Sequence, residues 1–280
     1  MNIPCLFLSV LSTGCLSRKQ DVGVVSQDEE EIVIHDIAVL STTRVLVTDW
    51  TYKTLRLVDS QNGGVVAKLC LTTKPFKLCH VRDGRAVVTL PFEKRIQFIR
   101  IDRDTLTLDK SVDMNGTVAG IAAFDSHLVV SYQDPGSVEK ITIMGKVTRK
   151  LNYQTAGKEL IWSPYFIAIS ESGYVFVSDC GTNIITQLDE NLQFIQTFTF
   201  NSPMMKTPAG IVFVNSTQLL VAARDSHNIL VLNTITGTVT TLLGQAEGIH
   251  NPRAVAWYPV NKALYVSLDG PVKTIMKFQG

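Results

Sequence analysis

Short apolar runs separated by turn residues repeat along this chain. In residues 163–200 four such runs, FIAI, YVFVS, IITQL and FIQTFTF, alternate with turn segments rich in Gly, Asn, Asp and Ser. Each run is too short for a helix and is rich in β-branched and aromatic residues. The segment is therefore predicted to form a four-stranded antiparallel meander. A meander with two apolar faces needs other sheets to pack against, and copies of itself supply them.

The second strand of this meander recurs along the whole chain. A small residue follows each apolar triplet, and successive small residues are 41, 42, 47, 44 and 45 positions apart. These six positions are Thr48, Thr89, Ser131, Ser178, Ala222 and Ser267. A four-stranded propeller blade takes about 40 to 50 residues. The spacing predicts an all-β fold, a six-bladed β-propeller of four-stranded antiparallel blades.

The sixth blade lacks one strand, because the chain ends at KTIMKFQG after the third. A ring closes best when one terminus donates the strand that the other lacks. We predict that residues 21–26 pair as the outer strand beside residues 273–278. Residues 19–280 then form one propeller, and residues 1–18 form a leader or a signal-like apolar segment.

Composition adds few constraints on function. The net charge is +1 over 280 residues, which favours neither nucleic acid nor a membrane as a global partner. The five cysteines are odd in number and lack CxxC spacing, so reduced thiols are expected. They are Cys5, Cys15, Cys70, Cys79 and Cys180.

The N-terminal apolar run has no Lys or Arg before it and is too short to span a bilayer as a helix. We expect a cytoplasmic protein, with secretion as the alternative if residues 1–17 act as a signal peptide.

Two stretches carry a resemblance to a known family. TPAGIVFV…LLVAARDSHNILVLN and SPYFIAIS…VFVSDCGTNIITQLD resemble the NHL repeat. Residues 19–280 resemble the C-terminal NHL propeller of tripartite-motif (TRIM) proteins, in particular the divergent kind found in molluscs. The chain carries no Cys/His pattern of a RING or B-box and no heptad coiled coil. The resemblance implies a substrate-recognition part of a TRIM-like ubiquitin ligase.

Propeller geometry indicates where a binding site lies. One face, here called the top face, collects the starts of the inner strands and the loops between second and third strands, and such loops are where function is usually carried. Aromatic residues alternate with Lys and Arg there, above all in blades 1 and 2. The candidate binding surface is Trp50, Tyr52, Lys53, Phe76, Lys77, Phe92, Lys94, Arg95, Tyr132, Trp162, Tyr165, Arg224, His227 and Arg253.

Three functions fit this surface. The first is a non-catalytic interaction module in which exposed aromatics and arginines anchor a protein partner. The alternative is binding of single-stranded RNA, with bases stacked on the rings and phosphates held by the cations. The second alternative is a metal-dependent propeller hydrolase or lyase. It lacks support from the blade starts, which mostly carry groups that cannot bind a metal. We therefore predict no enzyme activity, no catalytic residue, no metal and no cofactor.

Overall fold

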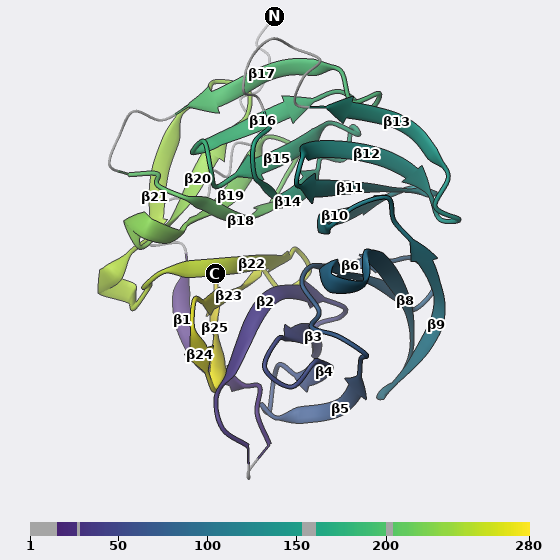
Figure 1. Ribbon diagram of the computed structural model, residues 1–280. Coiled ribbons are helices and arrows are strands. Elements are labelled where there is room, and N and C mark those ends of the chain that lie inside the picture. Colours follow the sequence, from purple (N-terminus) through teal and green to yellow (C-terminus); the bar gives the residue numbers. More distant parts are fainter. Residues whose placement is uncertain (1–15, 27–28, 153–160, 200–203) are drawn as a thin grey trace, which may run out of the picture.

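Six antiparallel sheets surround a central axis in the computed structural model, which describes residues 16–26, 29–152, 161–199 and 204–280 (Figure 1). Each sheet has its first strand nearest the axis and its fourth at the rim. The predicted all-β, six-bladed propeller is confirmed.

The strands follow the chain from blade to blade, and the described residues include three short 3-10 turns. Blade 1 contains β2 (Ile32–Val39), β3 (Arg44–Asp49), β4 (Thr54–Asp59) and β5 (Val65–Cys70), and the short β24 (Pro271–Val272) pairs with β2. Blade 2 contains β6 (Leu78–Val81), β7 (Arg85–Leu90), β8 (Arg95–Asp102) and β9 (Thr105–Asp113). Blade 3 contains β10 (Val118–Phe124), β11 (His127–Gln133), β12 (Gly136–Thr142) and β13 (Val147–Asn152).

Blade 4 contains β14 (Pro164–Ile169), β15 (Val175–Asp179), β16 (Ile184–Leu188) and β17 (Phe194–Thr199). Blade 5 contains β18 (Pro208–Phe213), β19 (Gln218–Ala223), β20 (Asn228–Asn233) and β21 (Val239–Leu243). Blade 6 contains β22 (Pro252–Tyr258), β23 (Ala263–Leu268), β25 (Thr274–Gln279) and β1 (Ser17–Gly23). The 3-10 turns are η1 (Pro91–Glu93), η3 (Arg224–Ser226) and η4 (Gln245–Glu247).

The N-terminal strand closes the ring, as predicted, but with different bounds. β1 pairs antiparallel with β25, with Asp21 opposite Met276 and Val22 opposite Ile275 (Figure 1). The strand runs from Ser17 to Gly23, whereas the prediction placed it at residues 21–26 and began the propeller at 19. The exposed polar residues at 17–21 hid it, because an outer strand at a rim needs few apolar side chains.

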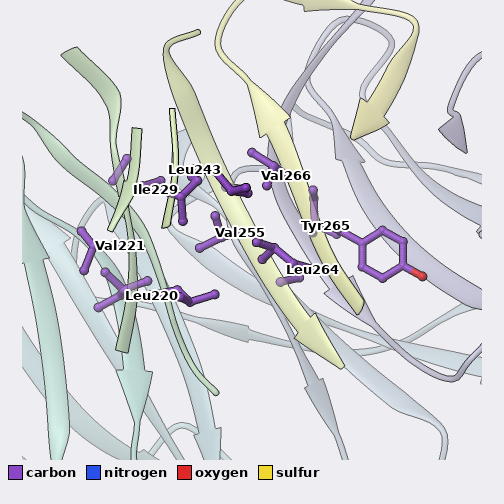
Figure 2. Packing of buried hydrophobic residues seen from close by; sticks show 14 of the residues in the cluster. Leu220, Val221, Ile229, Leu243, Val255, Leu264, Tyr265 and Val266 are labelled. Atoms are coloured by element: carbon purple, nitrogen blue, oxygen red, sulfur yellow. The ribbon is translucent and has the colours of Figure 1, made fainter. Parts of the chain in front are cut away.

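The apolar core lies between neighbouring blades. Figure 2 shows one such contact, where Leu220 and Val221 of β19 lie near Val255 of β22 and Leu264 of β23. The second strands β15 and β19 are buried along their whole length between the adjacent blades, and they are almost continuously apolar. This is why the second strands gave the clearest signal in the sequence.

The small residues that mark the second strands link one blade to the next. The Thr89 hydroxyl accepts a hydrogen bond from Lys77 N in its own blade and donates to Ala119 O, at 2.9 Å, in blade 3. Ser178 donates in the same way to Ala209 O in blade 5. Blade 5 has Ala222 at this position, and a Cβ added at Gly210 would lie 2.8 Å from Arg253 O of blade 6. Blades 5 and 6 are therefore joined by close backbone contact at Gly210 rather than by a hydrogen bond from a hydroxyl at position 222.

A buried ion pair joins blade 1 to the segment that follows β1. Arg56 is fully buried and donates to Asp49 Oδ2 and, at 2.6 Å, to Glu29 Oε2. Burial acts to raise the pKa of Glu29, but hydrogen bonds from Arg56, Lys68 and Ser26 outweigh it and lower this pKa to about 2. Glu29 thereby helps to hold the segment that follows the closing strand against blade 1.

Two expectations concern residues at or near the N-terminus. The predicted leader or signal segment falls mostly on residues 1–15, outside the described residues. Within the described residues, no helix has the length and apolar character needed to cross a bilayer.

Cys70, Cys79 and Cys180 are free thiols.

Candidate binding cleft on the top face

A cleft of about 560 Å³ opens on the top face over blades 1 to 4. Aromatic side chains dominate its lining, and we call it the aromatic cleft. It is lined by His35, Trp50, Phe76, Pro91, Phe92, Lys94, Thr117, Gln133 and Tyr165. Five of the predicted surface residues, Trp50, Phe76, Phe92, Lys94 and Tyr165, therefore come together in one depression.

The rings of the cleft contact one another in a continuous series. The centroid of Trp50 lies 4.5 Å from that of His35 and 5.6 Å from that of Phe92. Phe76 lies 4.8 Å from His35 and meets Tyr165 edge to face at 5.1 Å. These separations lie in the range of favourable aromatic pairs. The cleft wall is consequently a preformed aromatic surface.

Local backbone structure places these rings. Trp50 directly follows β3, and its backbone N–H donates to Val33 O at 2.9 Å. Phe92 lies in η1, the single turn between β7 and β8, and its side chain is 67% exposed. Lys94 ends that turn in the left-handed region with φ of 50°, and its N–H donates to Pro91 O. The tight turn holds Phe92 out toward solvent.

Two lysines, Lys74 and Lys94, lie at the rings of the cleft. Lys74 Nζ lies 5.1 Å from the Trp50 ring centroid, a cation–π contact. Lys94 lines the cleft, and Lys53 projects from the exposed loop between β3 and β4. Among the described residues none of these three lysines forms an ion pair. Arg95 differs, because its Nε lies 3.3 Å from Glu93 and 3.7 Å from Asp113.

Lys77 does not lie on the surface, contrary to the prediction. It is 1% exposed, and its Nζ donates to His35 O at 2.9 Å. The same nitrogen lies 3.2 Å from the Phe166 ring centroid and under 5 Å from those of Phe76 and Tyr165. Burial lowers the pKa of Lys77 well below its usual value. Lys77 was predicted to be exposed because it follows Pro75 in the loop before the inner strand. In the structure its side chain points inward.

Asp36 is buried beside Lys77 and links two blades. Its carboxylate accepts hydrogen bonds from Ile37 N in blade 1 and Leu78 N in blade 2, both at 2.9 Å. Burial raises its pKa to about 6, although Lys77 and these hydrogen bonds act in the opposite direction. This residue holds the inner strands of blades 1 and 2 in register beneath the cleft.

The other side of the top face carries a connected set of ion pairs. Arg253 donates to Asp269 through Nε at 2.8 Å, and Arg224 lies 3.6 Å from the same carboxylate. Arg224 also pairs with Asp225, which accepts a hydrogen bond from Thr207. We call Arg224, Asp225, Arg253 and Asp269 the ion-pair network. Both predicted arginines are thus engaged within the protein.

His35 connects the ion-pair network to the aromatic cleft. Its ring packs on Trp50 and Phe76, while Arg253 Nη1 lies 2.6 Å from its Nδ1. Burial, followed by the positive charges of Lys77, Arg253 and Lys74, lowers its pKa to about 2. The imidazole is therefore neutral in the physiological range and serves as an acceptor for Arg253.

The remaining predicted residues lie apart from the cleft. Tyr132 is buried and donates to Glu139 at 2.8 Å, so it is not a surface residue. Tyr52 is partly exposed on the top face, with Arg56 above its ring. Trp162 is exposed, and its backbone N–H donates to Asp179. His227 accepts a hydrogen bond from Asn251 N through Nδ1.

Four residues that line the cleft are absent from the predicted surface: His35, Pro91, Thr117 and Gln133. Lys74, which contacts the Trp50 ring, is absent as well. Pro91 directly follows the second strand β7, Gln133 ends β11 and Thr117 immediately precedes β10, so these three share a position where a strand meets the top face. In the part of the chain that the structure describes, no three His, Cys, Asp or Glu side chains are grouped so as to hold a metal ion.

Solved structures similar to this chain are propellers of low sequence identity. Virginiamycin B lyase from Staphylococcus aureus, in a catalytically inactive variant with quinupristin, has a TM-score of 0.68 and 15% identity, covering 95% of this chain and 99% of the other. A streptogramin B lyase gives 0.67 and 12%, covering 94% and 97%. A functionally unknown protein from Desulfotomaculum acetoxidans gives 0.59 and 14%, covering 81% and 73%. No protein-family model and no curated protein matches the chain. The similarities support the six-bladed propeller fold.

Proposed function

We propose that this protein is an interaction module that binds a peptide segment of a partner protein in the aromatic cleft. The observation that carries the proposal is the series of contacting rings, His35, Trp50, Phe92, Phe76 and Tyr165, around an open depression. Phe92 is exposed and Trp50 and Tyr165 are half-buried, whereas Phe76, predicted to lie on the surface, is buried with His35 beneath them. Preordered aromatic side chains that a partner can reach are the usual anchors of protein interfaces. From the resemblance of the repeats to NHL propellers of TRIM proteins we further propose substrate recognition for a ubiquitin ligase, an assignment that no protein-family model supports.

The cleft also indicates what the peptide carries. An apolar or aromatic side chain would fill the depression and lose water against the rings. Lys74, which contacts Trp50, and Lys94, which lines the cleft, would attract carboxylates placed next to that anchor. Lys74 already occupies one face of Trp50, which disfavours a cationic ligand there. The preferred segment is therefore acidic with an aromatic or aliphatic anchor.

The experiment is selection from a random peptide library displayed on phage against the purified protein. We expect enrichment of peptides with Asp or Glu beside Phe, Trp or Leu. The matched control is the same selection against a double variant, Trp50→Ala with Phe92→Ala, which should lose these peptides. Selection of the same peptides by both proteins would rule out the cleft as their site.

Single-stranded RNA is the main competing ligand. Rings that stack bases and lysines that hold phosphates occur together in the cleft, as this ligand requires. A labelled random pool of short RNA titrated at several salt concentrations separates the two ligands. Tight binding that weakens steeply with salt, together with a failed peptide selection, would replace the peptide proposal by RNA.

A lyase activity is the second candidate, because the similar solved structures include virginiamycin B lyase. Incubation with quinupristin, followed by chromatography, tests it directly. A new product peak with this protein, but not with a heat-inactivated sample, would establish the activity.

A further inference from the structure

A small pocket of about 90 Å³ lies at the top end of blade 3, and we call it the polar pocket. It continues the aromatic cleft, because consecutive residues of the same two loops line the two depressions. Thr117 and Gln133 line the cleft, while their neighbours Gly116 and Asp134 line the polar pocket. A peptide that leaves the cleft over blade 3 therefore meets the polar pocket next.

A buried carboxylate forms the floor of the polar pocket. Glu139 of β12 is 2% exposed and accepts a hydrogen bond from the Tyr132 hydroxyl at 2.8 Å. Burial, followed by this hydrogen bond, raises the pKa of Tyr132, so the hydroxyl keeps its proton and donates. A Cβ added at Gly116 would lie 3.2 Å from the Tyr132 ring, so the glycine allows the loop to pack against the ring. The carboxylate is thereby held in one position.

One lysine of β13 balances the charge of this carboxylate. Lys150 Nζ lies 2.8 Å from Glu139 Oε1, and the Lys150 side chain is 45% exposed. An exposed lysine on a flexible stem gains little from its ion pair and can turn toward solvent at small cost. A buried carboxylate, in contrast, requires a cation beside it. Lys150 therefore occupies a position that the cation of a partner can take.

A second carboxylate lies at the rim of the pocket. Asp134 is exposed, and within the described residues it has neither an ion pair nor a hydrogen-bond partner for its side chain. With Asp134 and Glu139 against Lys150, the charged groups of the pocket are negative in sum. Lys74 and Lys94 make the part of the cleft over blades 1 and 2 positive. Charge therefore changes sign from the cleft to the polar pocket.

The size of the polar pocket limits what can occupy it. Its volume is well below the roughly 300 Å³ of the smallest typical small-molecule sites. The end of one side chain fits this space, and a free organic ligand does not. Because the pocket is negative and continuous with a peptide-sized cleft, a cationic side chain of the bound peptide is the occupant that matches it.

We propose that the polar pocket binds a lysine or arginine side chain of the peptide whose anchor fills the aromatic cleft, an inference that rests on the proposed function. The ammonium or guanidinium group replaces Lys150 as the partner of Glu139 and approaches Asp134. The peptide is then bound in one direction, with its acidic residues near Lys74 and Lys94 and its basic residue over blade 3. The preferred segment carries both charges, one on each side of the anchor.

Reversal of the charge at the rim tests the site. In the phage selection the native protein should enrich peptides with Lys or Arg at a fixed spacing from the anchor. Asp134→Lys should keep the anchor and lose this basic residue. Asp102→Lys makes the same change of charge at the far end of β8 and is also exposed, so it should select as the native protein does.

Two outcomes of the selection separate this inference from the proposed function. Anchored peptides without a basic residue, or the same basic residue selected by Asp134→Lys, would overturn the inference and leave the peptide cleft in place. Failure to select any anchored peptide on the native protein would overturn the proposed function and the inference together.

Removal of the competing lysine supplies a second test. Lys150→Met should strengthen binding of a selected peptide about threefold, because the peptide cation no longer displaces Lys150 from Glu139. Arg149→Met removes the same charge from the neighbouring residue of β13 and should leave the affinity within about twofold of the native value. Calorimetry measures both, together with a peptide in which Ala replaces the basic residue and which should not gain from Lys150→Met.

The result of this second test is also decisive. An equal gain in Lys150→Met and Arg149→Met, or weaker binding to a folded Lys150→Met variant, would overturn the replacement of Lys150 by the peptide cation. If Lys150→Met does not fold, the selection with Asp134→Lys decides the proposal.

Discussion

The two sides of the top face use the same residue types in different ways. Over blades 5 and 6, Arg224 and Arg253 are engaged by Asp269 and Asp225. Over blades 1 and 2, the lysines lie beside exposed rings without an ion pair among the described residues, and Lys74 contacts Trp50. A charge that is already paired contributes to the structure, whereas a charge beside an exposed ring is available to a partner. The comparison predicts stability effects on one side and binding effects on the other.

Removing the shared carboxylate should have the largest effect. Asp269→Ala leaves the largely buried Arg253 without its carboxylate partner and with only the neutral His35 ring beside it, so we expect a loss of about 3 kcal/mol in the free energy of unfolding. Urea denaturation measures this. Asp113→Ala, which removes an exposed carboxylate 3.7 Å from Arg95, is the control and should change stability by less than about 0.5 kcal/mol. Equal losses of stability in Asp269→Ala and Asp113→Ala would show that the ion-pair network contributes no more to stability than an exposed ion pair does.

Truncating Phe92, the most exposed ring of the cleft, should weaken binding and leave stability nearly unchanged. Phe92→Ala should weaken binding of a peptide selected on the native protein by about 2 kcal/mol, because the ring serves as an anchor. Its free energy of unfolding should stay within about 0.5 kcal/mol of the native value. Calorimetry of binding and urea denaturation of the same sample measure both. A large stability loss with little change in binding would make Phe92 a packing residue.

The pH dependence of stability should depend on His35, where the two sides meet. The folded pKa of His35 is about 2, below its usual 6.5, so the unfolded chain takes up a proton first as the pH falls. The stabilisation is present above pH 6.5 and decreases below it, by about 1 kcal/mol between pH 6.5 and about pH 5.5. A His35→Gln variant should lose this part of the slope in urea denaturation, and His127→Gln should retain it. An unchanged slope in His35→Gln would contradict the assignment.

Single charge changes at the cleft should have the smallest effect. Lys94→Gln should weaken peptide binding by about 0.5 kcal/mol and reduce its salt dependence, because a rim charge acts mainly through screened attraction. Arg95→Gln is the matched variant, since Arg95 already contacts Glu93 and Asp113. Titration at several salt concentrations measures both. A larger loss of peptide binding in Arg95→Gln than in Lys94→Gln would indicate that the peptide contacts Arg95 rather than the lysine that lines the cleft.

The fold was predictable because its signal is local and repeated. Thr48, Thr89, Ser131, Ser178 and Ser267 gave the period, and strands covered on both faces are apolar whatever their neighbours are. Burial of Lys77 and Tyr132 was not predictable. Lys77 is enclosed by rings of blade 2 and blade 4, and Tyr132 depends on Glu139 of the next strand. The sequence pattern assigns residues to strands, but the blade-to-blade packing decides which long polar side chains turn inward.

The pairing of β1 with β25 has a consequence for synthesis. Strand β1 cannot find its partner until β25 has left the ribosome, at a rate of about 5 to 20 residues per second. For about 15 to 60 seconds the newborn chain carries an unpaired edge at each end of an incomplete ring, and such edges attract other strands. Closure is therefore the last step in the assembly of the propeller, and the interval before it is when a chaperone would be of most use.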